Sequence, residues 1–186
     1  MNPHHPTLSR RMYLLVWLCG LLVAFAGLLS AEDALWPIDA PKKITSTFGE
    51  PRPGRYHLGV DFSSGGVTGK AVYALGDGWI SHVSTSPYGY GKLLVYTLEN
   101  GSVVRCGHLS GFLPAVEDRL DSLRARRHSY DVAYNPTPAM FRVKKGDIVA
   151  FSGESGSGPA HLHLEYRDPS GAFANPFLRG IASADT

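Results

Sequence analysis

The chain has 186 residues, with 18 lysines and arginines against 16 aspartates and glutamates and a formal net charge of +2. Two of those arginines lie in residues 1–31, which have no acidic residue, so the remainder has 16 basic and 16 acidic side chains. This neutral balance argues against a nucleic-acid partner, which normally binds a basic surface with clustered lysines and arginines. The remaining ~155 residues suffice for one domain, residues 32–186, with its own hydrophobic core.

Residues 1–31 have the layout of an export signal. Two arginines precede an uncharged apolar run from Met12 to Leu29, and small and then acidic residues follow it. The run also suffices to span a bilayer, for which about 17–25 residues are needed. A signal peptide is therefore favoured, while an uncleaved membrane anchor stays open. A lipoprotein is disfavoured, because no small residues precede Cys19 as a lipidation site requires. We expect an exported protein of the periplasm or cell envelope, anchored in the inner membrane if the apolar segment is retained.

Residues 32–186 contain short apolar runs separated by glycine, proline and small polar residues. Such runs are typical of β-strands, and we expect strands at residues 43–48, 59–62, 70–74, 79–84, 92–98, 102–108, 148–152 and 161–167. Asn100-Gly101 predicts a hairpin, because this pair tolerates the positive φ of tight hairpin turns. The predicted fold is therefore mainly β, an antiparallel β-sheet domain. Cys106 is its one cysteine, which excludes an intramolecular disulfide, and a buried small residue is favoured there over a nucleophile.

The segment at about 112–141 interrupts this strand pattern and predicts one inserted helix. From Leu113 to His128, apolar residues recur at helical spacing, with Pro114 near the start. The stretch that follows contains two prolines and predicts irregular backbone. One interpretation is a packed surface addition with a solvated charged face. The other is a lid or partner-binding element beside a functional cleft.

Two segments each present a pair of side chains that commonly bind metals. Alternate residues of an extended chain share a face, so His57 and Asp61 point to one side of their segment, as do His161 and His163 of theirs. Gly59 would leave room for a metal between the first pair. Catalytic zinc usually has three protein ligands and an open fourth position, and imidazole-rich sites suit zinc. We predict one Zn²⁺ per chain, with His57, Asp61 and His163 as its ligands.

Two further histidines predict acid–base chemistry at this site. His161 shares a face with His163, and His108 ends another predicted strand. A neutral imidazole can accept a proton from a metal-activated water, and a histidine can hydrogen-bond a developing oxyanion. His108 and His161 are therefore the candidate catalytic residues. His82 and His128 lie outside these motifs, and ordinary surface or core roles are favoured for both.

The motifs His57-x-x-x-Asp61, His108-Leu109 and His161-x-His163, in this order, resemble the lysostaphin-type zinc endopeptidases, the M23 peptidase family of LytM domains. The resemblance runs from residue 44 to about 178, without the insertion, and includes Ser46-Thr47-Phe48-Gly49, Gly76-Asp77-Gly78-Trp79-Ile80 and the segment 143–149. It implies an antiparallel β-sheet with a groove for peptidoglycan peptides, and peptide hydrolysis by a metal-activated water. It also implies zinc ligands at His57, Asp61 and His163, and catalytic histidines at positions 108 and 161.

Three functions follow as alternatives. The first is a zinc metalloendopeptidase of the cell envelope that hydrolyses peptidoglycan stems or cross-links. The second is a LytM-type regulator or peptidoglycan-binding module whose active site the insertion occludes. The third is a structural envelope protein that zinc only stabilises. The pair His108 and His161 favours the first, because a structural zinc needs no second pair of histidines and normally has four protein ligands.

Overall fold

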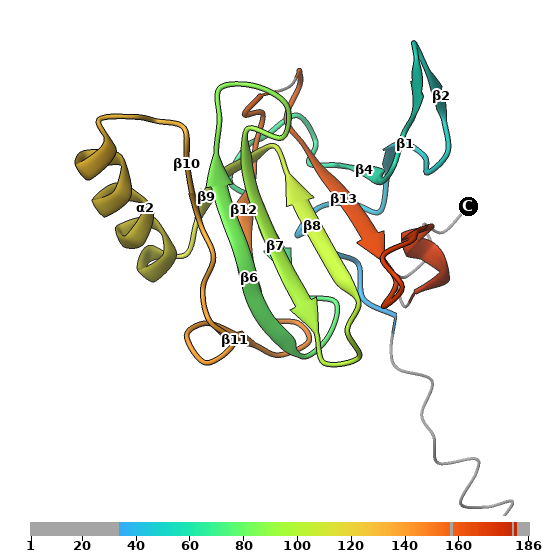
Figure 1. Cartoon of the computed structure of the whole chain (residues 1–186). Helices are drawn as coiled ribbons and strands as arrows, with labels where there is room; N and C mark the ends of the chain where they lie inside the picture. Colours follow the sequence, from blue (N-terminus) through green and yellow to red (C-terminus); the bar gives the residue numbers. More distant parts are fainter. Residues whose placement is uncertain (1–33, 157, 180, 182–186) are drawn as a thin grey trace, which may run out of the picture. The chain divides into compact units, whose positions relative to one another are not determined.

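The computed structural model describes residues 34–156, 158–179 and 181 (Figure 1). The predicted signal peptide or anchor, residues 1–31, lies outside the described residues and stays a prediction. Among the residues described, no helix combines the length and apolar character needed to cross a bilayer. The described part is mainly β, with antiparallel sheets and one α-helix.

The largest sheet of the described part has nine strands, and seven of them are neighbours in one continuous order. This order is β1 (Ile44–Ser46), β4 (Val60–Ser63), β13 (His161–Arg167), β8 (Val103–Gly107), β7 (Lys92–Leu98), β6 (Gly78–Thr85) and β10 (Val132–Tyr134). The two short strands off this path are β11 (Arg142–Val143), which pairs with β6, and β14 (Phe173–Ala174), which pairs with β13. Figure 1 shows β6, β7, β8 and β13 side by side.

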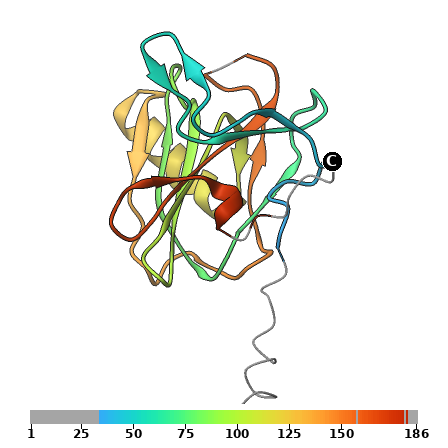
Figure 2. The same cartoon turned by 90° about the vertical axis from the view of Figure 1, so that its right-hand side faces the viewer.

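A second sheet and a separate hairpin complete the described strands. The second sheet has the order β5 (Ala71–Tyr73), β12 (Ile148–Ser152) and β9 (Leu109–Phe112). The hairpin pairs β2 (Pro51–Arg52) with β3 (Arg55–Tyr56). The helices are α2 (Pro114–Arg127) and the short 3-10 helix η1 (Pro176–Leu178). Figures 1 and 2 both show the hairpin, in teal, projecting beyond one end of the sheet.

The register of the main sheet separates a core face from a polar face. Leu164 on β13 pairs with Val60 on β4 and with Cys106 on β8, and all three side chains are fully buried in the hydrophobic core. Successive side chains of a strand point to opposite faces. Asp61 and His163, the adjacent residues, therefore point away from the core. A slip of one residue would bury these polar side chains in the core, so the apolar face fixes the register.

The predicted strand 102–108 ends earlier than expected, because the chain changes sheets at His108. β8 ends at Gly107 in the main sheet, and β9 begins at Leu109 in the second sheet. His108 has a φ of 58°, in the left-handed region that few non-glycine residues adopt. This backbone conformation breaks the strand. The predicted hairpin at Asn100-Gly101 is confirmed, with β7 and β8 paired and a φ of 85° at the glycine.

The helical insertion agrees with the sequence to within one residue at each end. α2 packs beside β9 and β10 and buries Val116 and Leu120 completely. The stretch after the helix is less irregular than predicted, because Val132–Tyr134 pairs with β6 as strand β10. Val132 is buried in the core. The free edge of the long strand β6 thus organises a segment whose two prolines predicted a loop.

Candidate functional site

Two neighbouring strands and the segment before one of them bring the predicted ligands together. Asp61 on β4 pairs directly with His163 on β13, and His163 in turn pairs with Gly107 on β8. His57 reaches the same place from the segment that precedes β4. A side chain at Gly107 would bring a Cβ within 2.9 Å of the Tyr90 ring, so glycine keeps the floor of the site open.

Gly59 makes room for strand β13 and for one of the ligands. A Cβ at this position would overlap the carbonyl oxygen of Leu164 and would lie 2.9 Å from Cε1 of His163. The sequence predicted that Gly59 leaves space for a metal. In the structure, the space is used by the backbone of the adjacent strand and by the imidazole ring of His163.

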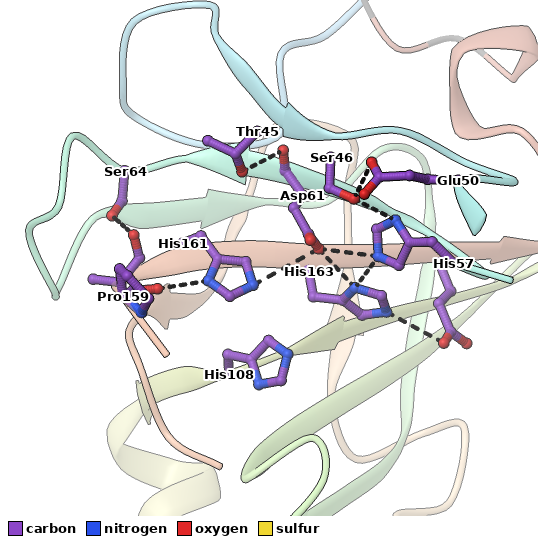
Figure 3. A network of polar contacts seen from close by, with 12 residues as sticks. Thr45, Ser46, Glu50, His57, Asp61, Ser64, His108, Pro159, His161 and His163 are labelled. Carbon is purple, nitrogen blue, oxygen red and sulfur yellow. Dashed lines mark hydrogen bonds and ion pairs between the residues drawn. The ribbon is translucent and has the colours of Figure 1, made fainter. Parts of the chain in front are cut away.

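The donor atoms of His57, Asp61 and His163 form a closed triangle (Figure 3). Nε2 of His57 lies 3.0 Å from Nδ1 of His163, which lies 2.8 Å from Oδ1 of Asp61; the third side of the triangle is 3.2 Å. A tetrahedral zinc site with bonds of about 2.0–2.1 Å separates its ligand atoms by about 3.3 Å. The triangle therefore fits zinc after outward shifts of a few tenths of an ångström. All three residues are buried, at 6–7% exposure.

Hydrogen bonds on the far side of each imidazole fix which nitrogen faces the triangle. Nδ1 of His57 donates to the backbone carbonyl of Thr47 at 2.9 Å, and Nε2 of His163 lies 3.3 Å from a carboxylate oxygen of Glu165. Carbonyl and carboxylate oxygens only accept, so these nitrogens carry the protons. With a cation in the triangle, Nε2 of His57 and Nδ1 of His163 would therefore be the nitrogens whose lone pairs face it, whereas in its absence Nδ1 of His163 donates to Asp61. Metal-ligating histidines are usually held in this way.

Glu165 is a buried carboxylate behind this cluster, with an exposure of 1%. The Tyr90 hydroxyl donates to the same Glu165 oxygen that faces His163, at 2.5 Å. Burial raises the pKa of Glu165, but the hydrogen bonds from His163 and Tyr90 outweigh burial and hold that pKa below its usual range. Glu165 is therefore ionised at neutral pH and increases the basicity of His163.

Without a metal, the surroundings of His163 favour its protonated form. Burial lowers the pKa of His163, but its hydrogen bonds with Asp61 and Glu165 outweigh burial and raise that pKa above its ordinary value. Burial raises the pKa of Asp61, yet the hydrogen bond from His163 and the neighbouring histidine charges hold it below its ordinary value. The second Asp61 oxygen pairs with Arg52 at 3.3 Å. A divalent cation in the triangle would displace the proton of His163.

The two predicted catalytic histidines lie beside the triangle, with ring centroids 4.8 Å apart (Figure 3). Nδ1 of His108 donates to the Ser155 carbonyl at 3.0 Å, and Nδ1 of His161 donates to the Pro159 carbonyl at 2.7 Å. In both residues, Nε2 is therefore the nitrogen available for chemistry. Burial lowers the pKa of His108 to about 4, so its ring is neutral at pH 7 and Nε2 can accept a proton.

The triangle and both histidines line one cavity of about 380 Å³. Its other walls come from the β2–β3 hairpin and from segments near Tyr90 and Gly156. The residues that line it are Arg52, Arg55, Tyr56, His57, Leu58, Asp61, Gly89, Tyr90, His108, Gly156, His161, His163 and Glu165. Residues 112–141, all described, contribute nothing to this lining. The described residues of the insertion thus form no lid over this cavity, while the choice between a packed surface addition and a partner-binding element stays a prediction.

Neither the models of protein families nor the curated proteins include a match to this sequence. Solved structures do match it. A zinc-containing peptidase from Vibrio cholerae is 25% identical, with a TM-score of 0.58, over 79% of this chain and 40% of the other chain. The catalytic domain of lysostaphin from Staphylococcus simulans is 23% identical, with a TM-score of 0.52, over 74% of this chain and 90% of the other. The chain has the lysostaphin-type fold.

This lysostaphin-type fold also occurs in an assembly that is not described as a peptidase. A chain of the SpoIIQ–SpoIIIAH pore-forming complex is 18% identical, with a TM-score of 0.56, over 82% of this chain and 92% of the other. The fold alone therefore does not decide between a peptidase and an assembly component. The chemistry of the side chains in the cavity is the better guide.

All five sequence-predicted site residues of this lysostaphin-type domain meet in one cavity, and their roles remain predictions. The motifs did not single out Glu165, Tyr90 or the hairpin arginines Arg52 and Arg55. Glu165 follows His163 by two residues and so shares its face, a signal that could have identified it. The hairpin lacks apolar alternation, and its Pro53-Gly54 turn offered only a weak signal. His82, which bonds to Asn135, and His128, which follows α2, do not line the cavity.

Proposed function

We propose that the protein is a zinc-dependent endopeptidase that hydrolyses peptide bonds in the stems or cross-links of peptidoglycan. The observation that carries this proposal is the triangle of three donor atoms beside two histidines with free Nε2 atoms. A structural zinc normally has four protein ligands, whereas the described residues supply three. Bound zinc would act as a Lewis acid and would make a water molecule acidic near neutral pH.

The side chains around the triangle suit the two proton-related tasks of peptide hydrolysis. His108 is neutral at pH 7 and held through Nδ1, so its Nε2 can accept a proton from the attacking water. His161, held by Pro159, presents Nε2 to the same cavity, 3.7 Å from Asp61. In its protonated form it can donate to the peptide oxygen as negative charge develops there. Both tasks leave the Nδ1 hydrogen bonds intact.

Two observations support peptidoglycan as the substrate, and a third supports the cell envelope as the location. One of the structural neighbours, lysostaphin, is described as an antimicrobial peptidase. The sequence motifs also resemble the family that acts on peptidoglycan peptides. The N-terminal segment predicts export, and we extend the proposal to an envelope protein that a retained apolar segment would tether to the inner membrane.

A non-catalytic role in an envelope assembly is the second candidate. The likeness to a chain of the SpoIIQ–SpoIIIAH pore-forming complex favours it. As a LytM-type regulator or binding module, the protein would need an inactive site, and the sequence suggested occlusion by the insertion. Residues 112–141 do not line the cavity. With His108 and His161 both in place, the peptidase is the better supported of the two.

The test uses the full chain, purified in mild detergent and loaded with zinc. We expect about one zinc per chain and solubilisation of purified peptidoglycan, followed by turbidity and by mass spectrometry of the released muropeptides. His108→Ala should retain the zinc and lose roughly 100-fold or more in turnover. His82→Ala, which removes a histidine outside the cavity, is the matched control and should change neither quantity. Unchanged turnover in His108→Ala would refute the catalytic assignment.

A further inference from the structure

The β2–β3 hairpin places two arginines opposite each other at the wall of the metal cavity. Arg52 and Arg55 are direct partners across the two strands, so their side chains leave the hairpin on the same face. Both side chains line the cavity that contains the triangle. Like charges directly opposite on paired strands are destabilising. The folding of this small, projecting hairpin therefore gains nothing from the pair (Figure 1).

The two arginines differ in their partners. Arg52 is half-buried, pairs with the outer oxygen of Asp61 at 3.3 Å and donates to the Ser46 hydroxyl at 2.6 Å. Arg55 is exposed, and its side chain has no ion pair or hydrogen bond with any residue that the structure describes. Arg52 thus belongs to the support of the metal ligands, whereas Arg55 presents an uncompensated guanidinium to the cavity.

The acidic side chains that line the cavity cannot neutralise Arg55. Asp61 is engaged with His163 and Arg52. Glu165 is buried and accepts hydrogen bonds from the side chains beside it. A divalent cation in the triangle would add further positive charge to the same space. The cavity therefore favours a ligand that brings its own negative charge.

We infer that Arg55 is a specificity-determining residue that binds a carboxylate of the substrate, so that the enzyme cuts acidic stem peptides in preference to neutral glycine bridges. This inference rests on the proposed peptidase function and defines its substrate more narrowly. The planar guanidinium binds a carboxylate through two parallel N–H donors. Tyr56 and Leu58, both exposed and both in the cavity wall, provide apolar contact for the carbon chain of an acidic residue.

Two matched probes test this inference. One is a purified cross-linked muropeptide dimer with free glutamate and diaminopimelate carboxyl groups, and the other is the same dimer after amidation of these groups. For the zinc-loaded full chain, we expect kcat/KM to be roughly 3- to 10-fold higher on the acidic probe, as for a partly exposed charged hydrogen bond. The preference should shrink at high salt, which screens exposed charges.

Variants at position 55 assign the preference to one side chain. Arg55→Gln should reduce the ratio of the two kcat/KM values to about one by slowing the acidic probe, with the amidated probe unchanged. Arg55→Lys should retain part of the preference, because it keeps the charge and loses the paired donors. Arg119→Gln makes the same change of charge on the exposed surface of α2, away from the cavity, and should leave the ratio unchanged.

Binding to zinc-loaded His108→Ala, measured by calorimetry with the two dimers and pentaglycine, separates this inference from the peptidase proposal. Arg55-dependent binding of the acidic dimer without cleavage of any probe by the wild type would refute the peptidase and uphold the carboxylate site. Equal cleavage of both dimers and of pentaglycine would uphold the peptidase and overturn the carboxylate site. An acidic preference that survives in Arg55→Gln, or no binding of any probe, would also overturn it.

Discussion

The ligand-bearing strands and the inserted helix bury different kinds of side chain. β4 and β13 bury an apolar face in the core and, on the other face, the polar cluster of Asp61 and His163. The helix α2 buries two apolar residues, and on its outer side the exposed Asp121 forms an ion pair with Arg124. Buried polar groups depend on every partner, whereas surface ion pairs contribute little.

This difference suggests that metal binding and helix packing can be changed separately. The positions of the ligands follow from the β4–β13–β8 register, which the core on the opposite face fixes. The helix contacts β9 and β10, and the residues of the insertion do not line the cavity. Changes in the cluster should therefore affect the metal, and changes in the helix should affect stability alone.

The largest effect is expected from removal of a predicted ligand. His163→Ala should weaken zinc binding roughly 100-fold or more. Structural zinc sites with four protein ligands bind the metal with about 10–16 kcal/mol, which is about 3 kcal/mol per ligand. His161→Ala, two residues away on the same strand, should retain zinc and lose turnover. Competition with a chromogenic chelator and the peptidoglycan assay measure both. Equal zinc affinity in His163→Ala and the wild type would contradict the ligand assignment.

A change in the helix should lower the stability of the fold and leave zinc affinity unchanged. Leu120→Ala removes a fully buried side chain and should lower the free energy of unfolding by about 2–5 kcal/mol. The zinc affinity of the folded protein should not change. Arg126→Ala, on the exposed surface of the same helix, is the control and should alter stability by less than about 0.5 kcal/mol. Urea denaturation measures the change in stability, and zinc titration measures the change in affinity. A tenfold loss of zinc affinity in Leu120→Ala would contradict the view that helix packing and metal binding are independent.

The same contrast explains what the sequence could predict. Alternation in the segments around Asp61 and His163 encodes which residues share a face, and the helical spacing of Val116 and Leu120 encodes α2. Both patterns are local. These patterns predicted the sheet class, the helix and four residues of the site, while His108 was predicted from the end of another strand and from the family motif; the structure brings all five together.

Features that depend on contacts between distant segments were not predicted. Pairing of Val132–Tyr134 with β6 requires a free strand edge that no local pattern reveals. The left-handed backbone of His108 follows from the switch between two sheets, and the sequence has no glycine there to signal it. The role of Glu165 appears only when Tyr90, 75 residues away in sequence, is brought to its carboxylate.

A substitution at Glu165 measures how much the zinc affinity of the cluster depends on this carboxylate. Glu165→Gln preserves the shape of the side chain and removes the charge behind His163, and it should weaken zinc binding roughly 10- to 100-fold. Glu99→Gln, at an exposed carboxylate paired with Arg142, is the matched control and should have no effect on zinc. The chelator competition assay measures both. Equal zinc affinities for the two variants would show that Glu165 is only a packed residue.

The smallest predicted effect is a pH dependence that separates the metal-free and zinc-loaded proteins. Hydrogen bonds to Asp61 and Glu165, which outweigh burial, raise the pKa of His163 in the metal-free fold. Protonated His163 therefore adds to the free energy of unfolding. This stabilisation is complete below the histidine pKa of the unfolded chain, about 6.5. It is lost as the pH rises through the higher pKa of His163 in the folded protein. Asp61, whose pKa is lowered, stays ionised throughout this interval.

Zinc reverses the sign of this contribution, because it binds His163 only without the proton. Between about pH 5.5 and 8, the stabilisation by saturating zinc should therefore grow with pH, and zinc affinity should fall by up to about tenfold per pH unit below the His163 pKa. Urea denaturation with chelator and with zinc across this range measures the difference. In Glu165→Gln, which lacks one cause of the raised pKa, the onset of this fall should move to lower pH. An onset that stays at the wild-type pH would show that the charge of Glu165 does not control the proton on His163.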